Sequence, residues 1–293
     1  MNPVRRPLLR RVLVANRGEV ALRIIRACRE AGLESVAVYS EADRSARHVR
    51  AADMAIHVGP APAADSYLRA DRIIEAALEC GADAVHPGYG FLSERADFAA
   101  ACQAAGLVFV GPAPATLAAL GDKLAARRLA ATAGIPLVPG TFEPLATHTA
   151  EAMAAVRAAA TRIGWPLLVK AAAGGGGRGM RRVDDEADLA AAIEAATREA
   201  AAAFGDGAVY LERHIEGGRH VEVQLLGDDH GRIVALGDRD CSIQRRHQKL
   251  VEEAPAPGLS AAQRQAVHAL GVRMAEAVGL RNAATAEFML TPQ

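Results

Sequence analysis

Lysine is nearly absent from this chain of 293 residues. Of its 34 basic residues only three are lysines, Lys123, Lys170 and Lys249, and arginine supplies the others. The two cations differ, because an ammonium is a compact point charge and a guanidinium is a planar fork. A chain with so few lysines is expected to keep them where a point charge is needed. Codon bias with three accidental lysines is the alternative, and it weakens if all three lie in otherwise unusual stretches.

The sequence also lacks net charge, long apolar runs and paired cysteines. A formal net charge of zero disfavours a nucleic-acid binder, which usually carries a basic excess. No apolar run approaches the roughly 20 residues that a membrane span needs. The four cysteines are widely spaced without a Cys-x-x-Cys pair, which disfavours a zinc site or a disulfide framework. The basic opening has no apolar signal core, so we expect a cytoplasmic protein.

Residues 1–110 are predicted to form a Rossmann-like domain. Strand-like and helix-like segments alternate there, which indicates an open, mostly parallel sheet. The expected strands are 11–16, 35–39, 55–58, 83–86 and 107–110, and the expected helices are 19–31, 66–80 and 94–105. The glycine-rich dinucleotide motif is missing after the first strand, where Asn16-Arg17-Gly18 stands instead, so a nicotinamide dehydrogenase is disfavoured. This tripeptide either binds an anion or only shapes the turn.

The second half of the chain predicts a different architecture. Residues 111–137 read as a helical linker, and residues 138–213 as a compact α+β unit with a helix capped by Asp184 or Asp185. From residue 214 the pattern becomes antiparallel β, with strands at 220–225, 233–236 and 283–290 and a helix that Ser260 caps. The loop at residues 86–94 contains two glycines, a proline and two aromatic residues, and it is expected to be a fixed structural loop.

A glycine-rich stretch follows Lys170 and a strand-like run. Five glycines fall within six positions: Gly174, Gly175, Gly176, Gly177 and Gly179. Without a Cβ, such a loop lets backbone N–H groups approach an anion closely. A flap over nucleotide phosphates and a plain glycine hinge are both open on this stretch alone. A Walker P-loop is excluded because no Gly-Lys-Ser/Thr follows.

Residues 239–249 concentrate basic side chains between apolar elements, with Arg239, Arg245, Arg246, His247 and Lys249 among them. We interpret this segment as a basic groove for a small polyanion. In the preceding strand, alternation places His220, Glu222 and Gln224 on one face, and such a face is usually solvated.

Glu287 lies in the last strand, which is otherwise apolar except for Thr285. A half-buried carboxylate is costly unless it is paired or bound to a metal. In nucleotide sites Mg²⁺ typically takes one or two carboxylates together with phosphate oxygens, so Glu287 is a candidate ligand. The alternative is a solvated side chain.

Together these motifs resemble biotin carboxylase, an ATP-grasp enzyme that occurs as a subunit or domain of biotin-dependent acyl-CoA and pyruvate carboxylases. The resemblance covers essentially the whole chain from about Arg11. It rests on four motifs: residues 15–19, residues 86–94, the glycine stretch, and residues 239–249. It implies an α/β protein in which a Rossmann-like N-terminal domain precedes an ATP-grasp fold. That fold would comprise an α+β lid at residues 138–213 and the first part of an antiparallel large subdomain at residues 214–293.

The resemblance also implies a reaction. Members of the family carboxylate biotin on a carrier protein, using bicarbonate and MgATP (or MnATP) by way of carboxyphosphate. The implied partners are a biotin carboxyl carrier protein or domain and a carboxyltransferase subunit, and homodimers are common. The Val251-Glu252-Glu253-Ala254-Pro255 stretch is closer to the acyl-CoA branch than to pyruvate carboxylase.

Roles for individual residues follow from the same resemblance. Lys123 and Lys170 would hold nucleotide phosphates beneath the flap of Gly174, Gly175, Gly176, Gly177 and Gly179. Glu212 would contact the adenine amino group, and Met289 would line the adenine pocket. His220, Gln244 and His247 would lie near the nucleotide. Lys249 would meet bicarbonate or the transferring phosphoryl group, with Arg246 beside it as a second catalytic candidate, and Glu287 would bind Mg²⁺.

Some features depart from the family pattern. Ala172 and Ala173 replace residues that are more often Ser and Gly, and Asp238 stands where Glu is usual. The family also continues well past Pro292 with a second metal carboxylate, a general base and arginines for bicarbonate and biotin. We therefore expect an incomplete and inactive or weakly active chain. The alternatives are a non-catalytic ATP-binding scaffold or another ATP-grasp carboxylate–amine ligase, and residues 239–249 argue against the latter.

Overall fold

The computed structural model describes residues 9–173, 180–245 and 248–291. The chain divides into two compact units, Met1–Ala118 and Ala119–Gln293, each with its own sheet or sheets. Within the described residues no helix combines the length and the apolar character that a membrane crossing requires. All four cysteines are buried.

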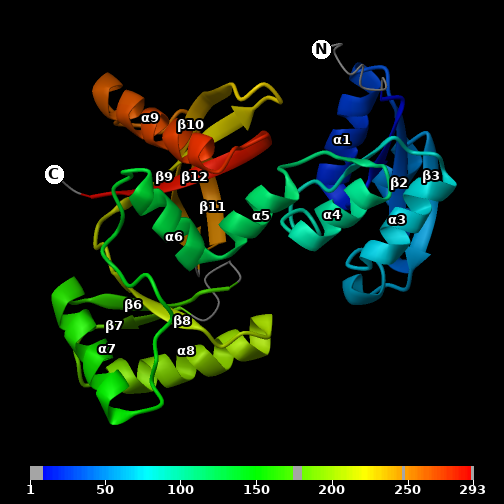
Figure 1. The fold of residues 1–293 in the computed structure, drawn as a ribbon. Coiled ribbons are helices and arrows are strands. Elements are labelled where there is room, and N and C mark those ends of the chain that lie inside the picture. Colours follow the sequence, from blue (N-terminus) through cyan, green and yellow to red (C-terminus); the bar gives the residue numbers. More distant parts are fainter. Residues whose placement is uncertain (1–8, 174–179, 246–247, 292–293) are drawn as a thin grey trace. The chain divides into compact units, whose positions relative to one another are not determined.

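The first unit is built on a five-stranded parallel sheet in the order β3-β2-β1-β4-β5 (Figure 1). Its strands are β1 (Arg11–Val14), β2 (Glu34–Ser40), β3 (Met54–Gly59), β4 (Ala84–His86) and β5 (Val108–Phe109). The longer helices are α1 (Gly18–Glu30), α3 (Ala70–Glu79) and α4 (Ala96–Ala104), and short helical turns stand at η1 (Glu41–Asp43), α2 (Arg47–Ala51) and η2 (Ala63–Asp65). This confirms the predicted Rossmann-like architecture.

Alternation along β1 and β2 explains why the sheet is covered on both faces. Leu13 and Val36 pack with the helices α3 and α4, whereas Val12 and Val14 pack against α1. Successive side chains of a strand point to opposite faces of the sheet, so a continuous apolar run contributes side chains to the core on each face. The predicted starts of two helices are wrong, because α3 begins at Ala70 and α4 at Ala96, with Arg69 and Arg95 as their N-cap residues.

Asn16 and the loop at residues 86–94 are tied to each other. The buried Asn16 donates from Nδ2 to the carbonyl oxygens of Pro87 (2.7 Å) and Tyr89 (2.8 Å), so this side chain does shape the turn. Gly88 has a positive φ of 65°, and a Cβ there would lie 2.9 Å from Asn16 Nδ2, so the turn requires glycine. Phe91 stacks on Tyr67, whereas Tyr89 is exposed.

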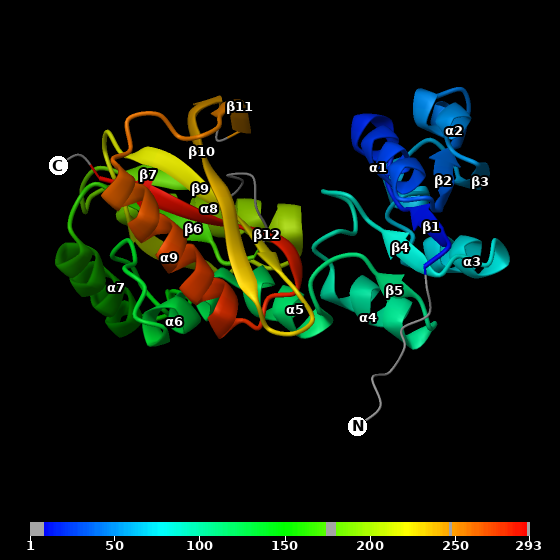
Figure 2. The same ribbon diagram turned by 90° about the horizontal axis from the view of Figure 1, so that it is seen from above.

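The second unit contains two antiparallel sheets (Figures 1 and 2). The three-stranded sheet, in the order β7-β6-β8, is formed by β6 (Leu167–Ala171), β7 (Arg181–Val183) and β8 (Val209–Arg213). Helices α7 (Ala150–Ile163) and α8 (Leu189–Phe204) accompany it and bury Val156, Leu189 and Ile193 against it. The helix α8 begins after Asp188, which forms no side-chain cap, so the predicted caps at Asp184 or Asp185 are wrong.

The four-stranded sheet of this unit has the order β11-β10-β9-β12. Its strands are β9 (Arg219–Gly227), β10 (Ile233–Arg245), β11 (Gln248–Glu253) and β12 (Asn282–Leu290). Helix α9 (Ala261–Ala277) packs on one face against Val223 and Leu225, and Ser260 opens it with a complete capping box, as predicted. Helices α5 (Pro114–Gly121) and α6 (Lys123–Thr132) lie within residues 111–137, which the sequence predicts to be helical.

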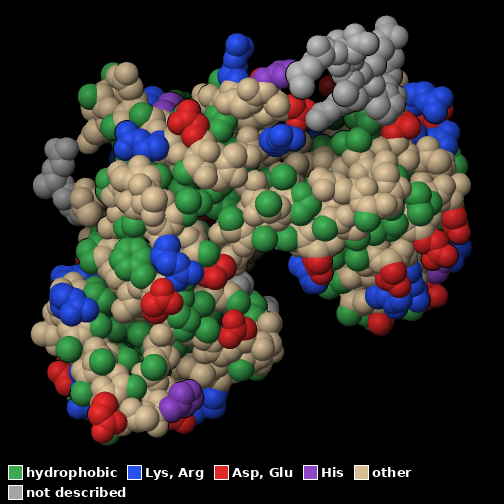
Figure 3. Space-filling model, viewed as in Figure 1, with side chains coloured by type: hydrophobic (Ala, Val, Ile, Leu, Met, Phe, Trp, Pro, Cys, Tyr) green, Lys and Arg blue, Asp and Glu red, His purple; other side chains and the backbone are tan. Residues whose placement is uncertain are grey.

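Charges of both signs lie beside one another on the face seen in Figure 3. The second unit has exposed ion pairs such as Arg182–Glu216 and Arg181–Glu199. Pairs of this kind contribute little to stability, typically less than about 1 kcal/mol. The energetically important charges of the second unit are the buried ones described below.

His48 in α2 is buried in the first unit and has an incomplete set of hydrogen bonds. Its Nε2 lies 3.3 Å from the Val38 carbonyl oxygen, and its Nδ1 has no partner among the described residues. Burial, which disfavours the charged imidazolium, lowers the pKa of His48. An unfolded chain therefore binds a proton at mildly acidic pH that the folded chain does not bind.

This difference predicts a loss of stability on acidification that comes from His48. As the pH falls below the ordinary histidine value of about 6.5, the free energy of unfolding should decrease, by up to about 1 kcal/mol at pH 5.5. Urea unfolding at pH 7.5 and pH 5.5, followed by circular dichroism, measures it in the native protein and in His48→Leu. The native protein should lose more stability than the variant. Equal losses in the two proteins would show that His48 titrates normally in the folded state.

Candidate active site

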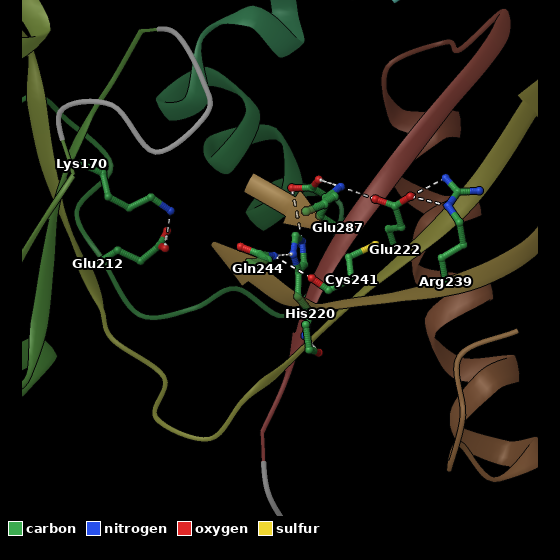
Figure 4. A network of polar contacts seen from close by, with 10 residues as sticks. Lys170, Glu212, His220, Glu222, Arg239, Cys241, Gln244 and Glu287 are labelled. Carbon is green, nitrogen blue, oxygen red and sulfur yellow. Dashed lines mark hydrogen bonds and ion pairs between the residues drawn. The ribbon is translucent and has the colours of Figure 1, made fainter. Parts of the chain in front are cut away.

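Two groups of polar and charged side chains mark the second unit, one centred on the half-buried Glu212 and the other on the buried Glu222 (Figure 4). The lid network consists of Lys123, Arg127, Lys170 and Glu212. The sheet network consists of the following residues of the four-stranded sheet: His220, Glu222, Arg239, Gln244, Lys249 and Glu287. All three lysines of the chain fall in these two groups, so their rarity did point to unusual places.

Strand pairing places Lys170 and Glu212 on the same face of the lid sheet. In the register of β6 with β8, Lys170 lies opposite Tyr210, and Glu212 is two residues along from Tyr210. Lys170 Nζ donates to Glu212 Oε1 at 2.7 Å, as the dashed line in Figure 4 marks. Burial alone would lower the pKa of Lys170, but the charge of Glu212 and this hydrogen bond outweigh burial and raise it. Lys170 is therefore a protonated ammonium at neutral pH.

Lys123 reaches the same end of β6 from a helix. It is the first residue of α6, whose N-cap Asp122 accepts hydrogen bonds from Leu124 N and Ala125 N. Its Nζ donates to the Ala171 carbonyl oxygen at 3.1 Å. Burial and the nearby positive charge of Lys170 lower the pKa of Lys123, because each disfavours the protonated form of the Lys123 side chain. An anion placed between the two lysines would relieve this repulsion.

The sheet network is assembled by register across neighbouring strands. Glu222 of β9 lies opposite Glu287 of β12 on one side and opposite Arg239 of β10 on the other. Lys249 of β11 donates to Glu222 and to Glu287 Oε1 (2.7 Å), and Arg239 also donates to Glu222. The side chain of Glu222 is only 4% exposed, so two cations neutralise a carboxylate that water scarcely reaches.

These contacts fix the protonation states of the sheet network. Burial would raise the pKa of Glu222, but hydrogen bonds and charges from Lys249 and Arg239 lower it. A hydrogen bond with His220, together with Lys249, lowers the pKa of Glu287 to about 2. Burial opposes a charge on Lys249, but its two glutamate partners raise its pKa. Both glutamates are thus ionised and Lys249 is protonated at neutral pH.

His220, Gln244 and Met289 extend the sheet network along the same face. Gln244 Nε2 lies 2.7 Å from His220 Nδ1 and donates to the Cys241 carbonyl oxygen at 2.8 Å, while His220 Nε2 lies 3.5 Å from Glu287 Oε2. Met289 stands opposite His220 in the register of β12 with β9 and is 41% exposed. An exposed methionine on a sheet face suits an apolar ligand surface.

Among the candidates named from the sequence, the structure gathers eight into these two networks or directly beside them: Lys123, Lys170, Glu212, His220, Gln244, Lys249, Glu287 and Met289. The remaining candidates lie outside the described residues, namely Gly174, Gly175, Gly176, Gly177, Gly179, Arg246 and His247. Their predicted roles stay predictions.

Two residues of these networks, Glu222 and Arg127, were not predicted from the sequence. The face that holds Glu222 was expected to be solvated, and this is wrong, because Glu222 is buried between Lys249 and Arg239. Accordingly, Arg239 and Lys249 do not line a purely basic groove, since acidic residues neutralise both. The signal for Glu222 was its pairing with Arg239 across β9 and β10, which only the register reveals. Arg127 had no distinguishing signal in an arginine-rich helix.

Glu287 is a single candidate metal ligand. The described residues also contain one cluster of three side chains that are close enough together to hold a metal ion. Glu222, Cys241 and Glu252 each place a ligand atom within 4.8 Å of the others. However, both oxygens of Glu222 already accept hydrogen bonds from cations, and burial raises the pKa of Cys241 to about 11, which keeps the thiol protonated. This cluster does not suit a metal. Glu287 suits Mg²⁺ better, because its carboxylate is a hard oxygen donor. It is half exposed, so it can exchange its contact with Lys249 for a metal ion.

The charge balance around Glu222 predicts a measurable loss of stability when the carboxylate is removed. Glu222→Gln leaves Lys249 and Arg239 without their shared partner in a partly buried site, which should destabilise the protein by about 2–4 kcal/mol. The matched control is Glu216→Gln, which removes an exposed partner of Arg182 and should change stability by less than about 0.5 kcal/mol. Urea unfolding measures both variants. Equal effects would contradict the assigned importance of the sheet network.

Family models match both units of the chain. The model "Biotin carboxylase, N-terminal domain" matches residues 8–117, and the model "Carbamoyl-phosphate synthase L chain, ATP binding domain" matches residues 122–293. The chain is 50% identical over 281 residues to the α subunit of mitochondrial methylcrotonoyl-CoA carboxylase from Oryza sativa subsp. japonica, covering 96% of this chain and 37% of that protein. It is also 50% identical over 282 residues to the biotin carboxylase of Pseudomonas aeruginosa, covering 96% and 62%.

Solved structures agree with these sequence relatives. The biotin carboxylase domain dimer of Hydrogenobacter thermophilus 2-oxoglutarate carboxylase, in complex with MgADP, ADP and bicarbonate, matches with a TM-score of 0.92 at 46% identity. That match covers 98% of this chain and 62% of the other. A biotin carboxylase–ATP complex from Campylobacter jejuni matches with a TM-score of 0.93 at 44% identity, covering 97% and 63%. The chain thus spans about six tenths of the length of the bacterial biotin carboxylase that it matches, and it belongs to the biotin carboxylase family of ATP-grasp proteins.

Proposed function

We propose that this chain supplies the nucleotide-binding part of a biotin carboxylase, which uses MgATP and bicarbonate to carboxylate biotin on a carrier protein. The observation that carries the proposal is the convergence of Lys123 and Lys170 at one end of β6, directly before the glycine stretch. Two ammonium groups beside a glycine-rich loop suit a polyphosphate. Family membership and a relative solved with MgADP and bicarbonate support the same reaction.

In this proposal Lys123 and Lys170 hold the phosphates, and the flap of residues 174–179 covers them. Glu212 receives the adenine amino group, while Met289, His220, Gln244 and His247 line the nucleotide site. Phosphoryl transfer depends mainly on positioning and on neutralising spreading negative charge. Lys249, already protonated between its two glutamates, meets bicarbonate or the transferring phosphoryl group, with Arg246 nearby.

Glu287 would hold Mg²⁺ (or Mn²⁺), which supplies charge neutralisation at the phosphates when it is bound. The low pKa of Glu287, about 2, keeps this carboxylate ionised as a ligand at every physiological pH. Lys249 and His220 keep it oriented in this structure. Their contacts are exchangeable, since the Glu287 side chain is 52% exposed.

Carrier, carboxyltransferase and dimer partners are further parts of the proposal. The H. thermophilus relative is a dimer, and the similar proteins include subunits of larger carboxylases, which supports a homodimer working with a biotin carrier and a carboxyltransferase. The cytoplasmic location is a part of the proposal that rests on the sequence alone. Identity does not select the final acceptor, because the chain is 50% identical to the methylcrotonoyl-CoA carboxylase subunit and 52% identical to pyruvate carboxylase 1 of Caenorhabditis elegans. The acyl-CoA branch remains our proposal, on the Val251-Glu252-Glu253-Ala254-Pro255 stretch.

Removing the Lys170 ammonium tests the phosphate role. Lys170→Met should weaken MgATP binding at least about tenfold, because a charge-assisted contact to phosphate is lost. Isothermal calorimetry measures the affinity, with Arg198→Met on the exposed face of α8 as a control that should bind like the native protein. Unchanged affinity in Lys170→Met would contradict the phosphate role.

A coupled assay of ADP release then separates the enzyme from a scaffold. For the full-length protein, ADP release should require both bicarbonate and free biotin, and Lys249→Met should reduce it strongly. Nucleotide binding without such turnover would favour a non-catalytic scaffold, and turnover that needs an amine acceptor would favour another ligase.

A further inference from the structure

Arg127 is a buried cation of the lid network that the proposed reaction leaves without a role. It lies on α6, one helical turn after Lys123, and is 8% exposed. Its Nη1 donates to Glu212 Oε2 at 2.8 Å and its Nη2 donates to the Val138 carbonyl oxygen at 2.8 Å. The planar guanidinium thus donates hydrogen bonds to a carboxylate oxygen and to a carbonyl oxygen at the same time.

The surroundings of Arg127 hold its guanidinium in place. The Cζ atom lies 5.5 Å from the ring centre of Phe142 and 5.8 Å from that of Tyr210, so two aromatic rings flank the cation. Gly140 pairs with Glu212 in a β-bridge, and a Cβ at Gly140 would lie 2.8 Å from Arg127 Nη2 and 2.6 Å from the Leu211 carbonyl oxygen. The segment around Gly140 therefore leaves just enough room for the guanidinium.

Glu212 divides its two oxygens between two different cations. Oε2 accepts from Arg127, and Oε1 accepts from Lys170 at 2.7 Å. The Glu212 side chain is 13% exposed, that of Arg127 is 10% exposed, and that of Lys170 is 26% exposed. Lys170 is thus the more accessible partner, and its ammonium lies at the end of a flexible stem without a second carboxylate among the described residues.

The proposed reaction asks Lys170 to bind phosphate, and this would take its ammonium away from Glu212. Removing one partner from a buried ion pair is costly, because the other charge is left uncompensated in a medium of low polarity. With Arg127 in place, Glu212 keeps a cation after Lys170 has left. Without it, Glu212 would compete with the phosphates for the Lys170 ammonium.

We propose that Arg127 is a positioning residue that neutralises Glu212 permanently and so frees Lys170 for the nucleotide phosphates. It also fixes the orientation of the Glu212 carboxylate, which the adenine amino group would meet. The lid network then carries three cations against one carboxylate, and the two excess positive charges are available to a polyphosphate. This inference rests on the proposed function, namely that the site binds MgATP.

A double-mutant cycle measured by calorimetry with MgATP tests the inference. Arg127→Met should raise the dissociation constant about tenfold when Glu212 is present, because Glu212 then retains Lys170. In the Glu212→Gln background, where no charge holds Lys170, the same replacement should change the constant by less than about twofold. Arg127→Lys, which keeps the charge but loses the fork, should recover part of the affinity.

The neighbouring Arg128 offers a matched control. It is exposed and contacts Glu143 and the Phe142 carbonyl oxygen, so Arg128→Met should bind MgATP like the native protein. Arg127→Gln, run in the same two backgrounds, gives the same comparison if Arg127→Met does not fold.

Three outcomes would overturn the inference. If Arg127→Met loses the same affinity in the native background and in the Glu212→Gln background, Arg127 only stabilises the lid. Native affinity in Arg127→Met would show that Lys170 leaves Glu212 without help. If the native protein itself binds no MgATP, the proposed function fails and the inference fails with it, whereas either of the first two results leaves the proposed function standing.

Discussion

Two glutamates of this protein, the half-buried Glu212 and the buried Glu222, are each shared by one arginine and one lysine. Glu212 binds Arg127 and Lys170, and Glu222 binds Arg239 and Lys249. A buried carboxylate requires compensation, and a single cation that also has to serve a ligand cannot provide it all the time. The arginine supplies a fixed, forked partner, while the lysine carries a point charge on a mobile stem. The division of roles explains why a chain so rich in arginine has lysine at these positions.

The strands of the second unit make this arrangement possible. In each sheet the antiparallel register puts the glutamate and one of its cations on the same face of adjacent strands, Glu212 with Lys170 and Glu222 with Arg239. The second cation comes from α6 in the lid (Arg127) and from β11 in the four-stranded sheet (Lys249). Apolar side chains on the opposite face pack against helices, namely Val223 and Leu225 against α9 and Val169 in the lid core. If one strand shifted by one residue against its neighbour, its charged side chains would point into the apolar core. The apolar pattern of the strands therefore also specifies which charged residues lie opposite one another.

Much of this organisation is readable in the sequence. Alternating patterns located the parallel sheet and its order of elements, and the scarcity of lysine directed attention to Lys123, Lys170 and Lys249. Helix starts were less predictable, because α3, α4 and α8 begin without a side-chain cap and the sequence offered attractive Asp and Ser residues several positions earlier. Glu222 and Arg127 were out of reach, since their importance depends on which residues lie opposite them in space.

Membership of the biotin carboxylase family gives these networks a chemical setting, while the pairs themselves are properties of this chain. The lid and the four-stranded sheet each offer one lysine that shares a glutamate with an arginine, and Lys249 also pairs with Glu287. Binding energy from a nucleotide then need not be spent on separating an isolated buried ion pair. Lys123, repelled by Lys170 and without a carboxylate partner among the described residues, completes the lid as a receptor for an anion.

The most direct measurement is a crystal structure of the protein with a bound magnesium–ATP analogue. The division of roles predicts that Lys170 Nζ has moved from Glu212 to a phosphate oxygen, whereas Arg127 still donates to Glu212 and to the Val138 carbonyl oxygen. A nucleotide bound while Lys170 remains on Glu212, or with Arg127 turned away from Glu212 towards the phosphates, would contradict it.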